Sequence, residues 1–208
     1  MALTLFTTPV LTPILRGIAW IARGLTGWRV EGDVPDVRKL VVVVAAHTSN
    51  WDVPVGMMCA LKLQINPRWF VKDSFFRPPF GTFCRWLGAV PVDRSRATNL
   101  VAQAIEELRR GDDVMLVFTP EGTRKASRYW KSGFYHIAVG AGVPIALSYL
   151  DYGRKVGSLG PLFQPTGDIY ADIEKIRTHY EGVRGRYPEL QGPIEIAPPE
   201  AAARPEEA

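Results

Sequence analysis

The sequence is poor in the residues that build disulfide scaffolds, metal sites and redox centres. Its 208 residues include two cysteines, Cys59 and Cys84, and three histidines. Two cysteines are too few for a disulfide framework, and neither belongs to a CxxC pair or to a Cys/His spacing typical of metal ligands. We therefore expect no metal, no redox cofactor and a reducing compartment.

A membrane-spanning run is also lacking. Residues 1–15 carry no charge, but Arg16 ends this run short of the ~20 apolar residues that a spanning helix needs. No basic region opens the chain, which argues against a signal peptide. Arg16, Trp20, Arg23 and Trp28 mix basic and tryptophan side chains with apolar ones, a pattern typical of a helix in a membrane interface.

The N-terminal segment therefore has two readings, and we favour association with a membrane. In the alternative reading its helix packs on the core of the protein itself. We expect residues 1–30 to be a membrane-associating segment that meets an anionic membrane surface. The protein would then be peripheral or monotopic on the cytoplasmic face of the cell membrane.

Several common catalytic templates are missing as well. The chain contains no GxxxxGK[ST] phosphate-binding loop and no GxSxG nucleophile turn. Gly140-Ala-Gly142 does not continue as GxGxxG and precedes a strand pattern instead of a helix. No basic and aromatic signature of RNA binding is present. These absences argue against P-loop nucleotide hydrolysis, GxSxG-type serine hydrolysis and dinucleotide binding.

What the sequence does contain is the pattern of one globular α/β domain. Hydrophobic residues make up 47% of the chain and charged residues 22%. Lys39–Ala46 is a nearly continuous β-branched run, typical of a strand that is buried on both faces. Such runs alternate with helical patterns, which predicts a mixed, largely parallel sheet flanked by helices over residues 31–196. Residues 197–208, rich in Ala, Pro and Glu, are predicted to be a disordered tail.

Further elements follow from apolar periodicity. We expect strands at Arg68–Val71, Val90–Val92, Asp113–Phe118 and Pro144–Leu150, and helices at Asp52–Leu63, Phe80–Leu87 and Thr98–Arg110. Residues 134–141 fit another helix. A late helix is predicted to run from Ile169 through Tyr180 to Val183.

Charge is distributed unevenly along the chain. Residues 1–131 carry 18 basic and 11 acidic side chains, or +7, whereas residues 132–208 carry 7 basic and 10 acidic ones, or −3. A basic first part indicates an anionic partner, which could be a phosphate-bearing metabolite, a membrane surface or nucleic acid. Composition alone does not choose among them.

His47 and Asp52 form the first polar cluster, directly after the Lys39–Ala46 strand. If the next helix starts at Ser49 or Asn50, the intervening loop can bring the two side chains together. A carboxylate then fixes the tautomer of the histidine and lets it act as a general base. The alternative is a polar loop histidine followed by an acid that only suits the helix dipole.

Two more clusters follow predicted strands. Asp93-Arg94 comes after Val90–Val92, and Glu121-Gly-Thr-Arg124 comes after Asp113–Phe118. Arginine suits phosphate because its planar group donates two parallel hydrogen bonds, and a glycine lets backbone approach a ligand closely. The alternatives are a surface ion pair and a basic turn. Because ligand sites of such sheets lie at the carboxyl ends of strands, we expect all three clusters at one edge.

Taken in order, these motifs resemble the glycerophospholipid acyltransferase family, which includes 1-acylglycerol-3-phosphate acyltransferases. The resemblance covers roughly residues 40–150 and rests on His47-x4-Asp52, Gly88 to Arg94, and Pro120-Glu-Gly-Thr-Arg124. The segment Lys72 to Gly81 and Val143-Pro144-Ile145 also resemble family blocks. The third block departs from the pattern, because Thr119 separates Phe118 from Pro120 and Lys125 stands where serine is common.

The resemblance implies transfer of a fatty acyl group from acyl-CoA or acyl carrier protein to a hydroxyl of a lysophospholipid, first of all 1-acylglycerol-3-phosphate, with phosphatidate as product. His47 would be the base and Asp52 its orienting acid, while Glu121 would orient an arginine or an acceptor hydroxyl. Backbone N–H groups after His47 could hold the oxyanion. The residues expected to bind the acceptor are Arg94, Glu121, Gly122, Thr123, Arg124 and Lys72.

Rival readings remain open from sequence. The same chemistry could act on glycerol-3-phosphate, a lyso-ornithine lipid or a glycolipid. A non-catalytic protein that binds anionic lipid would keep the fold but not need His47 and Asp52. Nucleic acid is disfavoured because the basic residues gather near strand ends instead of along one element. No cofactor is expected beyond the acyl donor.

Overall fold

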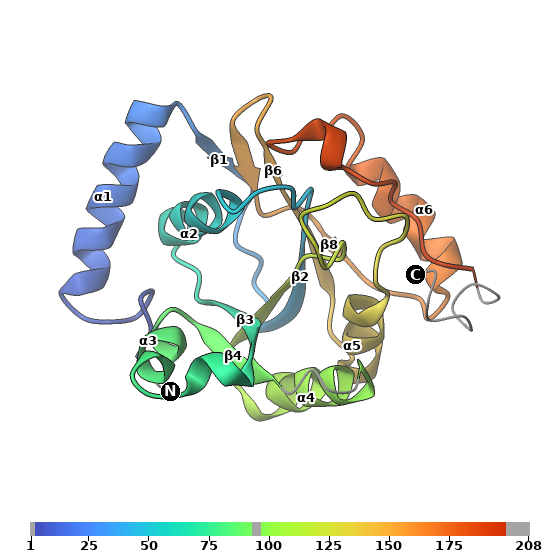
Figure 1. Cartoon of the computed structure of the whole chain (residues 1–208), viewed down its shortest axis with the longest axis horizontal. Coiled ribbons are helices and arrows are strands. Elements are labelled where there is room, and N and C mark those ends of the chain that lie inside the picture. Colours follow the sequence, from blue (N-terminus) through green and yellow to red (C-terminus); the bar gives the residue numbers. More distant parts are fainter. Residues whose placement is uncertain (1–2, 93–96, 199–208) are drawn as a thin grey trace.

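The computed structural model describes residues 3–92 and 97–198, and it contains one sheet with helices on both faces (Figure 1). The strands are β1 (Arg29–Glu31), β2 (Lys39–Ala45), β3 (Pro67–Lys72), β4 (Ala89–Val92), β5 (Val114–Phe118), β6 (Ile145–Asp151), β7 (Val156–Ser158) and β8 (Leu162–Phe163). The helices are α1 (Leu11–Thr26), α2 (Asp52–Leu63), α3 (Phe80–Trp86), α4 (Ala97–Arg110), α5 (Gly133–Ala141) and α6 (Ile169–His179), with short 3-10 turns η1 (Asp73–Phe76) and η2 (Pro188–Leu190).

The sheet is mixed and mostly parallel, which confirms the predicted fold class. Its strands follow the order β1-β7-β6-β2-β5-β3-β4, and β8 pairs with β6. The pairs β6–β7 and β6–β8 are antiparallel, whereas all the other pairs are parallel. Because β2, β5, β3 and β4 run in the same direction, their carboxyl ends meet at one edge, where the polar clusters follow them.

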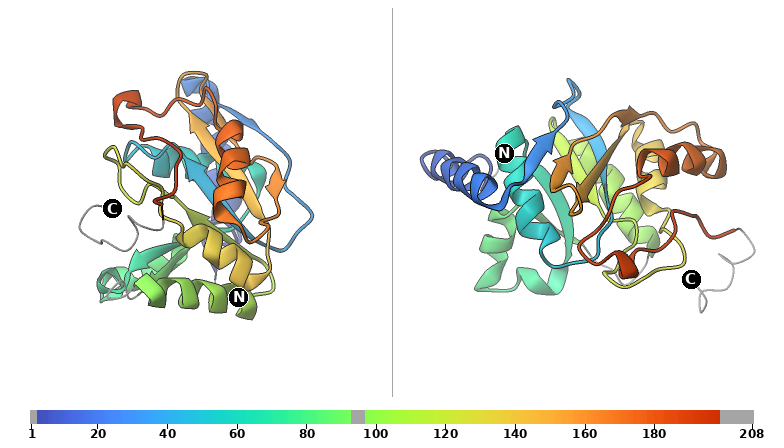
Figure 2. Two further views of the ribbon diagram at one scale, coloured as in Figure 1. Left: turned by 90° about the vertical axis from the view of Figure 1, so that its right-hand side faces the viewer. Right: turned by 90° about the horizontal axis from the view of Figure 1, so that it is seen from above.

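The apolar run of β2 is explained by its place in the middle of the sheet. Val41 and Val43 lie in a core cluster with residues of α4, α5 and α6, whereas Leu40 and Val42 lie in a cluster on the other face. Successive side chains of a strand point to opposite faces, so a strand covered on both sides has no polar position to fill. The two layers of helices are visible in the turned views (Figure 2).

Helix α1 forms an outer layer beside α2 at one end of the molecule (Figure 1). It buries the small side chains Thr12 and Ala19 and leaves Ile14, Ile18, Ile21 and Leu25 exposed. In residues 3–92 and 97–198, no helix combines the length and the apolar character needed to cross a bilayer. The predicted boundaries at residues 30 and 197 stay predictions, and the first of them falls inside β1.

One expectation about local structure needs correction, and three short strands were missed. Helix α6 ends at His179, so Val183 lies beyond it, after a turn in which Gly182 has φ +78°. Strands β1, β7 and β8, which have three, three and two residues, were not predicted from the sequence. Strands this short show too little alternation to be distinguished from loops, and their pairing depends on distant partners.

Candidate active site

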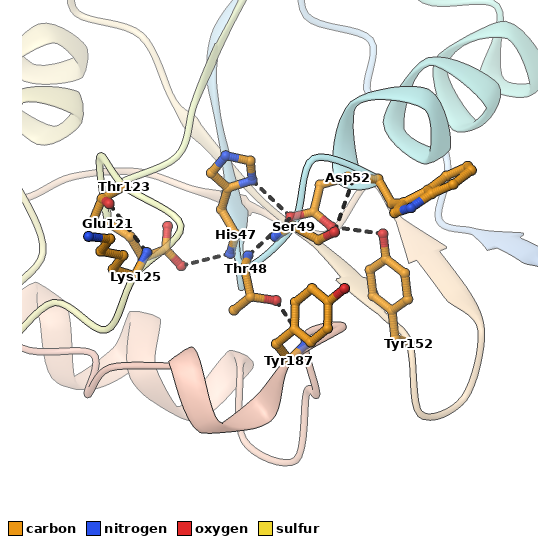
Figure 3. A network of polar contacts seen from close by, with 10 residues as sticks. His47, Thr48, Ser49, Asp52, Glu121, Thr123, Lys125, Tyr152 and Tyr187 are labelled. Carbon is orange, nitrogen blue, oxygen red and sulfur yellow. Dashed lines mark hydrogen bonds and ion pairs between the residues drawn. The ribbon is translucent and has the colours of Figure 1, made fainter.

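His47 and Asp52 are in direct contact at the carboxyl end of β2 (Figure 3). The Nδ1 atom of His47 lies 2.8 Å from Oδ2 of Asp52. Since the carboxylate accepts, Nδ1 carries the proton and Nε2, on the other edge of the ring, keeps its lone pair. This is the arrangement of a general base that is held in one tautomer.

The loop between the two residues wraps its backbone around the carboxylate. The N–H groups of Thr48 and Ser49 donate to Oδ2 of Asp52 at 3.1 and 3.0 Å, and the hydroxyl of Ser49 accepts from the N–H of Trp51. Helix α2 begins at Asp52, which agrees with the predicted range Asp52–Leu63, and Ser49 and Asn50 belong to the loop before it. The oxyanion hypothesis is wrong for the amides of Thr48, Ser49 and Trp51, because these donate within the loop.

Asp52 is buried, yet its surroundings favour the charged form. Burial by itself opposes ionisation and would raise the pKa, but hydrogen bonds from His47, Tyr152 and Ser49 and the charge of His47 act in the other direction. Together these contacts hold the pKa of Asp52 below its ordinary value. The aspartate is thus an anion at neutral pH and can stabilise an imidazolium when His47 takes up a proton.

The loop after β5 forms a basic pocket next to His47. The pocket measures about 330 Å³, and it is lined by His47, Thr119, Gly122, Thr123, Arg124 and Lys125. Gly122 turns the chain here, since its N–H donates to the carbonyl of Thr119 and its φ is +65°. Thr123, Arg124 and Lys125 are exposed, so cationic and hydroxyl groups stand beside the base.

Glu121 has a different environment from its neighbours in this loop. Its side chain is buried, and Oε1 accepts from the backbone N–H of His47 at 3.1 Å, while Oε2 has no hydrogen-bond partner. Burial raises the pKa of Glu121 above its ordinary value, although the hydrogen bond from His47 acts against this. Its hydrogen bond supports the backbone of His47. The role expected for Glu121, to orient an arginine or an acceptor hydroxyl, stays a prediction.

The other expected residues are less closely tied to this pocket. Lys72 is exposed at the end of β3, which is separated from β2 by β5, and it does not line the pocket around His47. Arg94 lies outside the described residues. No group of three or more His, Cys, Asp or Glu that could hold a metal occurs in the described ranges.

Two residues near the base were not identified as site residues from sequence. Lys125, noted from the sequence only because it stands where serine is common, lines the pocket. The hydroxyl of Tyr152 donates to Oδ1 of Asp52 at 2.8 Å, although the two residues are 100 positions apart. No local pattern marks Tyr152, whereas the basic run Arg124-Lys125 could have indicated Lys125.

The arrangement can remove a proton from the hydroxyl group of a molecule that also carries an anionic group, such as a phosphate, bound nearby. In the neutral imidazole, Nε2 of His47 can accept a proton, and Arg124 and Lys125, which line the same pocket, supply positive charge. Deprotonation of an alcohol needs such a base, because the hydroxyl pKa is far above neutral. The site thus suits nucleophilic attack by an alcohol that carries a phosphate or another anion.

Comparison with known proteins gives concordant results. The chain is 29% identical over 140 residues to a 1-acyl-sn-glycerol-3-phosphate acyltransferase of Haemophilus influenzae, an alignment covering 61% of this chain and 56% of that protein. It is 29% identical over 122 residues to the enzyme of the same name from Streptococcus pneumoniae, covering 54% and 44%. The chain spans about half the length of these curated relatives.

A solved structure shares the fold. The crystal structure of the 1-acyl-sn-glycerophosphate acyltransferase from Thermotoga maritima matches with a TM-score of 0.55 and 22% identity, over 83% of this chain and 76% of that one. The family model described as Acyltransferase matches residues 28–147, which include His47, Asp52 and Glu121–Arg124. The match covers more than half of the sequence, and the chain therefore belongs to the acyltransferase family.

Proposed function

We propose that this protein is an O-acyltransferase that moves a fatty acyl group from a thioester to a hydroxyl of a lysophospholipid. The preferred acceptor is 1-acylglycerol-3-phosphate, which would become phosphatidate, and the donor is acyl-CoA or acyl carrier protein. The observation that carries the proposal is that the His47–Asp52 pair opens onto the pocket that Thr123 and Arg124 line. The names of the two curated relatives support the same activity.

In the proposed reaction His47 acts twice. Nε2 first takes the proton of the acceptor hydroxyl as its oxygen attacks the thioester carbonyl, and Asp52 stabilises the imidazolium that forms. When the tetrahedral intermediate collapses, the carbon–sulfur bond breaks and the thiolate takes the proton from the imidazolium. No acyl-enzyme is needed, because the thioester is already activated.

The acceptor phosphate would be bound by the basic loop. Arg124 can donate two hydrogen bonds to one phosphate, and Thr123 can donate its hydroxyl proton while its oxygen accepts from the N–H of Lys125 at 3.2 Å. Gly122 keeps this part of the loop free of a side chain. Arg94 and Lys72, which follow or end the outer parallel strands, would add positive charge for the rest of the headgroup.

The decisive experiment is a matrix of acceptors and donors with purified protein. The acceptors are lysophosphatidate, glycerol-3-phosphate, a lyso-ornithine lipid and a lysoglycolipid, each tested with acyl-CoA and with acyl carrier protein. We expect transfer to lysophosphatidate with at least one donor. A strong preference for another acceptor would support acyl transfer but replace lysophosphatidate as the proposed substrate. If a folded protein transferred no acyl group in any combination, the proposed function would be contradicted.

We further propose that the protein is peripheral or monotopic on the cytoplasmic face of the cell membrane and docks through α1. Ile14, Ile18, Ile21 and Leu25 share one face of α1 and are 53%, 56%, 54% and 84% exposed. The other side of the helix carries Arg16 and Arg23, which line a pocket of about 180 Å³ together with Lys62 of α2. An interfacial helix has this division, with apolar side chains toward the acyl chains and cations at phosphate level.

Vesicle sedimentation tests the docking. The double variant Ile18→Asp/Ile21→Asp should lose most of its binding to vesicles that contain phosphatidylglycerol, because it places two charges in the apolar face. Val139→Asp provides the control, since Val139 is an exposed aliphatic residue of α5 on another part of the surface. Equal binding by the double variant and the control would contradict docking through α1.

A further inference from the structure

Tyr152 reaches the base pair from a part of the chain that no acyltransferase motif covers. It directly follows β6, the strand that pairs with β2 in parallel and places Tyr149 opposite Ala45. The carboxyl end of β6 therefore lies beside the end of β2, where His47 begins its loop. Through this pairing, Tyr152 comes to the same edge of the sheet as Asp52 (Figure 3).

The hydroxyl of Tyr152 donates to the second oxygen of the Asp52 carboxylate, Oδ1. Oδ2 accepts from His47 and from two backbone N–H groups, and Oδ1 accepts from Tyr152 at 2.8 Å. An ionised carboxylate has about four acceptor positions, two on each oxygen, so three donors share Oδ2 while Oδ1 accepts from Tyr152. The two oxygens thus have different partners: Oδ2 accepts from the imidazole and the loop amides, and Oδ1 accepts from Tyr152.

The ring of Tyr152 is itself held in place. Trp28 meets it edge-on, with centroids 5.0 Å apart, and Arg186 stacks its guanidinium 5.9 Å from the ring centroid. The phenol remains a donor at working pH, because burial and the hydrogen bond to Asp52 raise its pKa above the ordinary value. A ring that contacts Trp28 and Arg186 and stays protonated at working pH can set the orientation of a carboxylate.

We propose that Tyr152 is a positioning residue that fixes the Asp52 carboxylate and, through it, governs proton uptake by His47. Its hydrogen bond draws negative charge from the carboxylate toward Oδ1, which leaves less to stabilise a proton on the imidazole. The inference rests on the proposed function only in giving His47 a catalytic task. The hydrogen-bonded link from Tyr152 through Asp52 to His47 is independent of the substrate.

The sign of the effect follows from the groups around the pair. The titratable or charged side chains that face the pair or line its pocket are Glu121, Tyr152, Arg124 and Lys125, and Arg186 and Cys59 act on Tyr152. Tyr152→Phe removes one donor to Asp52 and leaves the other members of this set unchanged. The imidazolium then gains stability, so His47 should titrate at a higher pH, and the acid limb of kcat/KM should move up with it.

Two readouts test the proposal in Tyr152→Phe. In protein labelled with ¹⁵N-histidine, NMR titration should show His47 shifted upward by about 0.5–1 pH unit, with His47→Ala used to assign the signal. The acid limb of kcat/KM should shift by the same amount, with kcat reduced about three- to thirtyfold and the acceptor KM unchanged. Replacement of Tyr152 by 3-fluorotyrosine, a stronger donor of similar size, should move both readouts downward.

Tyr170→Phe is the matched control, because the Tyr170 hydroxyl donates to the carbonyl of Ala197 and takes no part in the site. In Tyr170→Phe, the NMR titration of His47 and the pH profile of kcat/KM should equal those of the parent protein. An unchanged His47 titration in both Tyr152 variants overturns the inference, even if the enzyme is an active acyltransferase. If no acceptor is acylated but the two variants shift His47 in opposite directions, the proposed function fails and the link through Tyr152 stands.

Discussion

The two loops that meet at the pocket are built in opposite ways. In the loop from His47 to Asp52, a buried carboxylate accepts from an imidazole, two backbone amides and a phenol. In the loop from Gly122 to Lys125, the side chains are exposed, and the polar contact made by Thr123 is a single bond from the N–H of Lys125. The first loop is fixed internally, whereas the second presents its groups to solvent.

This difference matches the two tasks of the proposed reaction. Proton transfer needs the base within hydrogen-bond distance of a hydroxyl in a narrow range of angles, which a fully bonded loop can hold. Phosphate binding needs accessible positive charge that adjusts to the headgroup. Glu121 joins the two regions, because it belongs to the second loop in sequence but accepts from the backbone of His47. Substitutions in the loop from His47 to Asp52 should therefore lower kcat, whereas substitutions in the loop from Gly122 to Lys125 should raise the KM for the acceptor.

His47→Ala should have the largest effect. Removal of the base leaves the hydroxyl proton without an acceptor, so kcat should fall about 10²- to 10⁴-fold while the acceptor KM changes little. The fold should persist, because the side chain of His47 lies at the edge of the sheet and not in the core clusters. Initial rates with each donor and a thermal melt check this result. Near-normal turnover by the folded variant would rule out His47 as the base.

Asp52→Asn should have the second-largest effect, and the loss of stability that it causes should depend on pH. The pKa of Asp52 is lowered in the folded state, so the charged form stabilises the fold above the ordinary Asp value of about 3.9, and this contribution is lost as pH falls through the folded-state pKa. The variant should be about 1–3 kcal/mol less stable at pH 7, with a smaller difference from the parent protein below about pH 4.

Urea unfolding at several pH values measures this dependence, and initial rates at pH 7 should show kcat reduced by about two orders of magnitude or more, because the amide no longer fixes the tautomer of His47. A stability difference that stays constant from pH 7 to pH 3 would contradict the ionised state assigned to Asp52.

The same contrast explains what could be predicted from the sequence. The apolar run of β2 and the polar clusters after β2 and β5 are local patterns, so the sheet and the meeting of His47 with Asp52 could be expected. The contact of Tyr152 with Asp52 joins residues 100 positions apart, and that of Glu121 with His47 joins residues 74 apart. Such contacts depend on strand order, which no local pattern specifies. The start of α2 at Asp52 was predicted, but the hydrogen bonds from the Thr48 and Ser49 amides to the Asp52 carboxylate were not.

Arg124→Gln tests the second loop and should affect binding. Loss of a charged donor to phosphate costs about 1.5–3 kcal/mol, which raises the acceptor KM about 10- to 100-fold with kcat nearly unchanged. Arg128→Gln is the control, since its guanidinium stacks 5.1 Å from the ring centroid of Tyr129 and does not line the pocket. A fall in kcat alone, or an equal effect of both variants, would remove Arg124 from the phosphate site.

Gly122→Ala should have the smallest effect and tests the shape of the second loop. Gly122 has φ +65°, a conformation that costs an L-residue about 1–2 kcal/mol, and an added Cβ would lie 2.8 Å from Cε of Lys131. Because that contact is with a flexible side chain, Lys131 can move, and the cost should be mainly backbone strain. We expect a loss of about 1 kcal/mol in unfolding free energy and a KM increase of a few fold.

Gly56→Ala makes the same chemical change as Gly122→Ala but should increase the free energy of unfolding instead of lowering it. Gly56 lies inside α2, and an added Cβ there would meet nothing within 4 Å, so alanine should stabilise the helix by about 0.5–1 kcal/mol. Urea unfolding of both variants compares them directly. The strain in Gly122→Ala lies in the loop that presents Arg124. The KM increase in this variant should therefore appear with a phosphate-bearing acceptor and disappear with an uncharged one. An equal KM increase for both acceptors would mean that the loop does not shape a phosphate site.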